Sequence, residues 1–119
     1  MIETNPEDVG VMTRADRSDD PGHHRMLIIA GHLVVESADR DAYVAECAPI
    51  VEAARATAGC LDFSITADGI DPTRVCIYER WDSEDQLLAF RGAGVGTNQQ
   101  AQVLDADVKR YAISSVGGP

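Results

Sequence analysis

The chain has 119 residues, of which 45% are hydrophobic and 25% are charged, a composition typical of a globular domain. Twenty acidic residues against ten basic ones give a formal net charge of -10. A field of that sign repels phosphate backbones and anionic lipids, so nucleic acid and membrane surfaces are excluded as expected partners. No apolar run approaches the roughly 18–20 residues that span a bilayer, and no secretory signal precedes the domain.

Cysteine usage indicates the compartment. Cys47, Cys60 and Cys76 show neither C-x-x-C spacing nor an even count. They are interpreted as small buried thiols in a reducing environment, and we therefore expect a cytoplasmic protein.

Residues 1–25 differ in composition from the rest of the chain. They hold six acidic residues and few large apolar side chains, too little apolar surface to offset the entropy of ordering. We predict a mobile acidic N-terminal tail, a domain over residues 26–115 and a frayed end at 116–119. His23 and His24 are interpreted as solvated tail residues rather than a metal site, and no metal ligands are predicted.

The first predicted strand covers residues 27–35, a β-branched run that is apolar on both faces. Gly31 within it indicates a bulge or a close backbone approach.

A helix is predicted to open at Ser37 or Asp39, either of which can cap its first turn. Pro49 removes one backbone donor and predicts a kink, and Gly59 is expected to end the helix as a left-handed cap. The apolar stripe of this helix recurs at helical spacing, at Tyr43, Cys47, Ile50 and Ala54.

Two strands and a turn follow. Residues 60–67 alternate between apolar and polar side chains, which predicts a strand with one apolar face. Residues 68–73 (DGIDPT) have the composition of a hairpin loop, and residues 74–81 form the third predicted strand.

The last third of the chain begins with a capping box, Ser83 with Gln86 three residues later, which opens a second helix. The glycines of residues 92–96 end it. A short helix is expected at 97–100, and residues 108–114 read as a fourth strand.

The order strand, helix, strand, strand, helix, strand is that of the ferredoxin-like α+β fold, with a four-stranded antiparallel sheet. Helices on one face would leave the other face open, and an apolar face of that size marks an association surface. We therefore expect a homodimer whose two sheets pack together. The residues assigned to this open face are Ile28, Ala30, Val34, Val75, Ile77 and Trp81.

Three segments carry a family resemblance: residues 26–32 (MLIIAGH), 58–63 (AGCLDF) and 78–83 (YERWDS). In this order they resemble the antibiotic biosynthesis monooxygenase family, a branch of the dimeric α+β barrel proteins. The resemblance covers about three quarters of the chain. It implies a cofactor-independent monooxygenase that oxidises a quinol or polycyclic phenol with molecular oxygen in an apolar pocket. An electron-rich phenolate or carbanion can itself reduce oxygen, so the protein has to bind the ring, help to remove a proton and exclude water.

Two residues are the catalytic candidates. Trp81, the single tryptophan, matches the tryptophan that family members place in the pocket, and the alternative is a structural aromatic that fills the dimer core. His32 matches a first-strand pocket position, and histidine is a residue type suited to proton removal at neutral pH; the alternative is a core histidine bonded to backbone.

The expected substrate-binding residues are Ile28, Ala30, Ile77, Phe90 and Arg91. Departures from the family bear on the chemistry. The chain has no histidine after His32, so the haem ligand of haem-degrading relatives is missing and haem degradation is not expected. The family resemblance implies that no cofactor is used. The asparagine of some polyketide oxygenases is replaced by Ile77. A dimeric barrel that binds a small ligand without catalysis therefore stays open as the alternative function.

Overall fold

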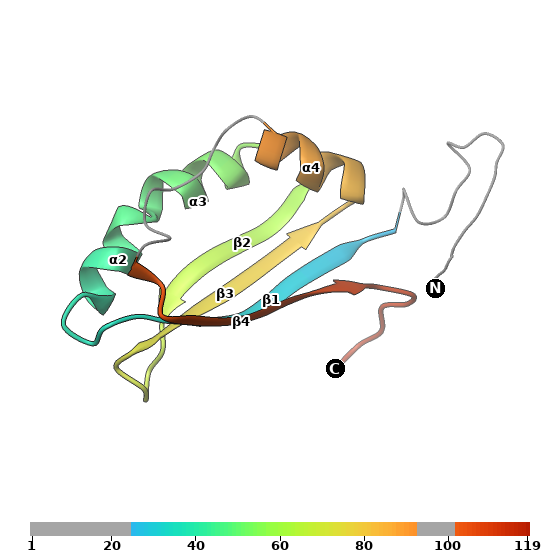
Figure 1. Ribbon diagram of the computed structural model, residues 1–119. Helices are drawn as coiled ribbons and strands as arrows, with labels where there is room; N and C mark the ends of the chain where they lie inside the picture. Colours follow the sequence, from blue (N-terminus) through green and yellow to red (C-terminus); the bar gives the residue numbers. More distant parts are fainter. Residues whose placement is uncertain (1–24, 93–101) are drawn as a thin grey trace, which may run out of the picture.

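The computed structural model describes residues 25–92 and 102–119. The strands of this part form one antiparallel sheet in the order β2-β3-β1-β4. In chain order the elements are β1 (Leu27–Val34), α2 (Arg40–Glu46), α3 (Ala48–Arg55), β2 (Cys60–Ala67), β3 (Arg74–Trp81), α4 (Glu84–Gly92) and β4 (Asp105–Ala112). This arrangement confirms the predicted ferredoxin-like α+β fold (Figure 1).

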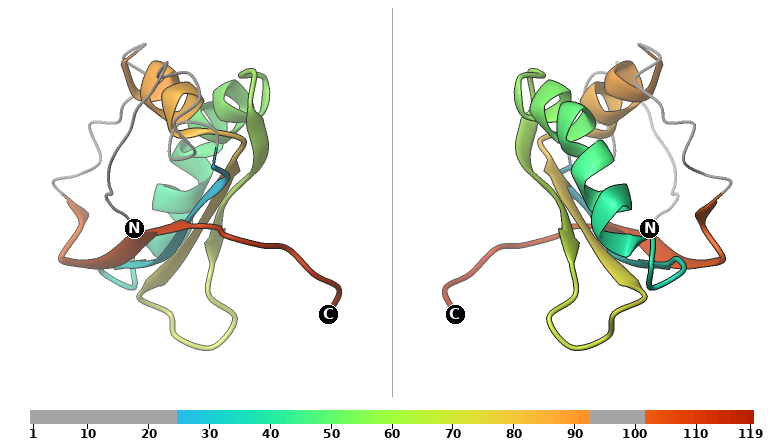
Figure 2. Two further views of the ribbon diagram at one scale, coloured as in Figure 1. Left: turned by 90° about the vertical axis from the view of Figure 1, so that its right-hand side faces the viewer. Right: turned by 90° about the vertical axis from the view of Figure 1, so that its left-hand side faces the viewer.

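The described helices α2, α3 and α4 all lie on one face of the sheet (Figure 2). We call this the helix-covered face and the opposite one the open face. Among the described elements, no helix packs on the open face, and no described helix is long and apolar enough to cross a bilayer.

The predicted strands agree with the structure where side chains alternate clearly. β2 and β3 have the predicted bounds, and β1 ends one residue earlier than predicted. β4 covers residues 105–112 instead of 108–114. Seven of its eight residues are exposed, so its limits follow from backbone pairing with β1 and not from an apolar pattern.

The kinked helix predicted around Pro49 is two helices. α2 ends at Glu46, Cys47 joins it to α3, and Pro49 lies in the first turn of α3, where a missing N–H breaks no helical bond. The prediction that Gly59 caps this helix is wrong. Ala56 closes α3, and Gly59, with a φ of 89°, directly precedes β2.

Ser83 caps the start of α4, as predicted, through its hydroxyl group. The Ser83 hydroxyl accepts the backbone N–H of Gln86 at 3.4 Å and donates to Gln86 Oε1 at 3.3 Å. Ser83 thereby satisfies one of the free amides of the first turn.

Gly31 lies at a close approach between the backbones of β1 and β4. Its φ is 151°, and a Cβ added there would lie 1.9 Å from the carbonyl oxygen of Asp107. Only glycine accommodates both conditions. The predicted close backbone approach is confirmed.

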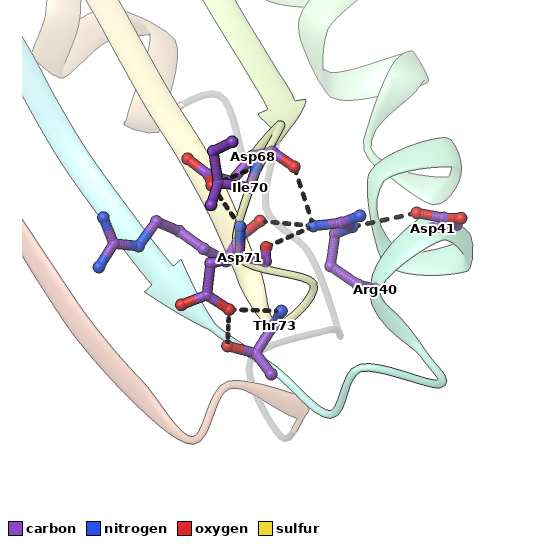
Figure 3. A network of polar contacts seen from close by, with 7 residues as sticks. Arg40, Asp41, Asp68, Ile70, Asp71 and Thr73 are labelled. Atoms are coloured by element: carbon purple, nitrogen blue, oxygen red, sulfur yellow. Dashed lines mark hydrogen bonds and ion pairs between the residues drawn. The ribbon is translucent and has the colours of Figure 1, made fainter.

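Arg40 ties the hairpin loop between β2 and β3 to α2. Its Nη1 donates to the backbone oxygens of Asp71 at 3.0 Å, Arg74 at 3.1 Å and Asp68 at 3.4 Å. Figure 3 shows the guanidinium reaching from the helix into the loop, while its Nε faces Asp41. The Arg40 guanidinium therefore joins α2 to three loop carbonyls, of which those of Asp71 and Arg74 also accept backbone N–H groups within the loop.

The strand register corrects the predicted open face. Leu27 pairs with Trp81 and Ile29 with Glu79, so odd-numbered residues of β1 share a face with odd-numbered residues of β3. Leu27, Ile29 and Trp81 are buried under the helices, which puts their even-numbered neighbours on the open face.

The six residues predicted to share one face therefore divide between two. Ile28, Ala30 and Val34 lie on the open face, whereas Val75, Ile77 and Trp81 lie on the helix-covered face. Alternation within each strand was predicted correctly, but it does not fix the register between strands.

The core under the helices consists of two clusters. The first is built from Leu27, Ile29, Ala54, Phe63, Trp81, Leu87 and Phe90. The second is built from Val35, Tyr43, Cys47 and Val75. Ile65 packs against both, so the two clusters meet at the middle of β2.

The N-terminal tail and the short helix predicted at 97–100 lie outside the described residues, apart from Arg25 at the end of the tail. The last residues, 116–119, are exposed and belong to no helix or strand.

Candidate functional site

The structure separates the two predicted catalytic residues. His32 lies on the open face, where it pairs in register with Cys76 and Asp107, and Trp81 lies on the helix-covered face. The sheet itself stands between them. His32 and Trp81 therefore cannot act on the same substrate molecule within one chain.

The predicted binding residues divide in the same way. Ile28 and Ala30 accompany His32 on the open face. Ile77 lies on the helix-covered face beside the second core cluster, and Phe90 packs from α4 onto the first cluster.

Trp81 is fully buried, with none of its surface exposed. Its ring lies 5.4 Å from that of Phe90, and Phe90 meets Phe63 edge-on at 5.9 Å. We call these three rings the aromatic cluster. Trp81 thus fills the core beneath the helices of its own chain, not the dimer core of the predicted alternative, and its indole face does not reach solvent.

The polar end of Trp81 is used within the protein. Its Nε1 donates a hydrogen bond of 2.9 Å to Oε1 of Glu79, two residues earlier on the same face of β3. Glu79 is half-buried and pairs in register with Ile29 and Phe63, both buried. The Glu79 carboxylate is therefore surrounded by apolar and aromatic side chains.

Burial raises the pKa of Glu79 above its ordinary value, because the charged form loses its hydration. The hydrogen bond from Trp81 and the positive charge of Arg91 both pull that pKa back down. Arg91 itself is exposed at the end of α4. Arg91 therefore acts on Glu79 through its positive charge, and not through a hydrogen bond that the structure shows.

Sequence reasoning missed Glu79, although β3 carries a signal for it. Val75, Ile77 and Trp81 occupy every second position, and Glu79 is the one charged residue in that series. An acid at a core-facing position of a strand is costly unless it is hydrogen-bonded, and such perturbed groups concentrate at functional sites.

A second feature lies at the outer edge of β2. It is a hollow of about 160 Å³ lined by Arg55, Cys60, Leu61, Asp62, Phe63 and Ser64. Arg55 Nε donates to the Phe63 carbonyl at 2.9 Å there, which satisfies an oxygen of this edge strand. In the described ranges, no group of three His, Cys, Asp or Glu side chains could hold a metal ion.

A single sheet with helices on one face, an aromatic cluster beneath them and an acid inside it defines an α+β domain of the ferredoxin-like class. Residues 26–95, more than half of the chain, match the model of the antibiotic biosynthesis monooxygenase family. The chain belongs to this family, which confirms the resemblance carried by the three sequence segments. No curated protein sequence matches the chain.

Solved structures support the fold. PA3566 from Pseudomonas aeruginosa is 18% identical, with a TM-score of 0.65 over 79% of this chain and 100% of that one. Rv0793 from Mycobacterium tuberculosis is 20% identical, with a TM-score of 0.65 over 78% of this chain and 99% of that one. A Deinococcus radiodurans protein, provisionally assigned as an antibiotic biosynthesis monooxygenase, is 18% identical, with a TM-score of 0.67 over 78% and 97%. At these identities the likeness concerns the fold alone.

Proposed function

We propose that this chain is a cytoplasmic monooxygenase that oxidises a quinol, or a polycyclic phenol such as an anthrone, with molecular oxygen and no cofactor. Membership of the family supports the reaction class. The observation that carries the proposal is the half-buried Glu79 carboxylate beside the aromatic cluster on the helix-covered face. Cys47, Cys60 and Cys76, all within the described residues, are not joined by disulfides, which suits a reducing compartment.

The reaction balances without a cofactor. An anthrone CH2 group and one O2 molecule give the ketone and one water, so the substrate supplies all four electrons that reduce oxygen. The protein has to hold the rings in an apolar environment, which aromatic and aliphatic walls provide. It also has to assist the loss of a proton, because the anion is the species that transfers an electron to oxygen.

The test is oxygen uptake by the purified protein with a panel of anthrones and hydroquinones. With ¹⁸O₂, the product ketone is expected to contain one ¹⁸O atom, as read by mass spectrometry. Uptake no faster than in buffer, across the whole panel, would contradict the proposal.

Two further outcomes distinguish other sites and functions. Quenching of the single tryptophan by the same compounds, without oxygen uptake, would favour the small-ligand-binding alternative. Loss of turnover in His32→Ala, with turnover kept in Glu79→Gln, would place the reaction on the open face instead.

A further inference from the structure

Glu79 differs in charge from the other strand residues that line the helix-covered face of the sheet. On this face β1 presents Leu27, Ile29, Gly31 and Leu33, and β2 presents Cys60, Phe63, Ile65 and Ala67. The strand β3 presents Val75, Ile77, Glu79 and Trp81, and β4 presents Ala106, Val108, Arg110 and Ala112. Of these side chains, Glu79 is the one carboxylate. It is also accessible, whereas its bonded neighbour Trp81 is not.

The surroundings of Glu79 suit proton exchange with an apolar substrate. Ile29 and Phe63 flank it in the adjacent strands, so the ionised form gains little from water on those sides. One carboxylate oxygen accepts the 2.9 Å hydrogen bond from Trp81 Nε1, and the two carboxylate oxygens together have further lone pairs available. The Trp81 bond fixes the orientation of the group and leaves acceptor capacity for a substrate proton.

We propose that Glu79 is the general base of the oxygenation and that Trp81 is its positioning residue. This inference rests on the proposed function. The Glu79 carboxylate removes a proton from the substrate C–H or O–H and becomes a neutral acid, which leaves a carbanion or phenolate.

The remaining steps return the proton. The anion transfers one electron to O2, and the resulting radical and superoxide combine into a peroxide anion. Glu79 gives its proton to this peroxide and is ionised again. It then removes the second C–H proton as the O–O bond breaks, which yields the ketone and, after protonation of the departing hydroxide, water. A base placed in this way typically contributes 10²–10⁴-fold to the rate.

Other ionisable groups face the same side of the sheet. Arg91 on α4 favours the ionised form of Glu79, and burial opposes it. Cys60 on β2 has a pKa raised chiefly by burial, so it stays a neutral thiol at pH 7. From β4 and α4, Arg110 and Glu84 face each other in an ion pair of 2.9 Å. On α3, the Arg55 guanidinium is bonded to a backbone carbonyl.

The experiment separates proton removal from oxygen chemistry. Anthrone is incubated with the protein in D₂O without oxygen, and exchange of its CH2 protons is followed by NMR. The wild type is expected to exceed buffer. Glu79→Gln, which keeps an oxygen for the Trp81 bond, is expected to lose at least about 100-fold of this enzyme-dependent rate. Glu52→Gln, at an exposed position of α3, is the matched control.

Each outcome has a definite meaning. Exchange at the wild-type rate in Glu79→Gln, or no acceleration by the wild type, would overturn the role of Glu79. Glu79-dependent exchange without oxygen uptake in air would leave the base in place and refute the monooxygenase proposal.

Trp81→Phe tests the positioning role. The Trp81 bond favours the ionised carboxylate, so its removal raises the pKa of Glu79. We expect the acidic limb of the exchange-rate profile to move to higher pH, with activity regained above it. A lowered rate with no movement of the limb would show that Trp81 serves packing alone.

Discussion

The Glu79 side chain occupies a position where an apolar residue would be more stable. Burial raises its pKa, so the folded state binds the Glu79 proton more tightly than the unfolded chain does. The stability associated with this group is complete below the unfolded pKa of about 4.3 and falls as pH rises through the folded pKa. The ionised form of Glu79 that the proposed activity needs is therefore the form that destabilises the fold.

The first prediction concerns this ionisation. Glu79→Gln is expected to be more stable than the wild type at pH 7, and the difference should shrink at about pH 3.5, where both states are protonated. Urea unfolding at the two pH values measures it, with Glu52→Gln as control. A gain of the same size at both pH values would instead mean that packing is responsible.

The second prediction is the loss of stability when Gly31 is replaced by alanine. Gly31→Ala places a Cβ 1.9 Å from the Asp107 oxygen at a φ of 151°, and should cost roughly 2–4 kcal/mol from backbone strain and overpacking. Urea unfolding gives the value. Gly69→Ala, with no atom within 4 Å of the new Cβ, should change stability by less than about 0.5 kcal/mol. Similar values for the two variants would refute the close approach.

At the scale of elements, the Arg40 side chain joins α2 to the hairpin loop by hydrogen bonds to three backbone carbonyls. Arg40→Lys keeps the charge, but its shorter side chain does not bring a nitrogen to the position of Nη1, so we expect a loss of about 1–3 kcal/mol. Hydrogen exchange of the loop amides and urea unfolding measure it. Asp41→Asn removes only the exposed ion pair of Arg40 and should cost less than about 1 kcal/mol. An equal loss in both variants would assign the effect to the ion pair.

Much of the element pattern could be predicted, because alternation in β2 and β3 reflects a buried and a polar side of each strand. The sequence could not predict that the proposed site residues lie on two opposite faces of the sheet. β1 is apolar on both faces, so nothing within it says whether Ile28 or Ile29 lies under the helices. That choice depends on the pairing of Leu27 with Trp81, a long-range register. Glu79 was missed for a related reason, since its significance depends on which side of β3 is covered.

At the scale of the whole molecule, the open face carries apolar side chains that no described helix covers. It presents Ile28, Ala30 and Val34 of β1 beside Tyr78, which is 38% exposed. We propose that a second copy of the chain packs on this face, since paired sheets remove such a surface from water.

Light scattering should therefore give twice the chain mass of 12.8 kDa. Both copies carry a net charge of -10, so added salt should strengthen the association. Tyr78→Glu should weaken it, while Leu88→Glu, at a position of α4 that is 49% exposed, should not. A mass of one chain at micromolar concentration would contradict the dimer.

The pairing of β1 with β4 also has a consequence for synthesis. β1 lies between β3 and β4 in the sheet, yet β4 begins about 80 residues after β1. At about 5–20 residues per second, the ribosome adds that stretch in roughly 4–16 s. Throughout this interval one side of the nascent first strand has no hydrogen-bonding neighbour from its own chain. The newly made protein thus keeps an unpaired strand edge, which favours aggregation, until β4 emerges.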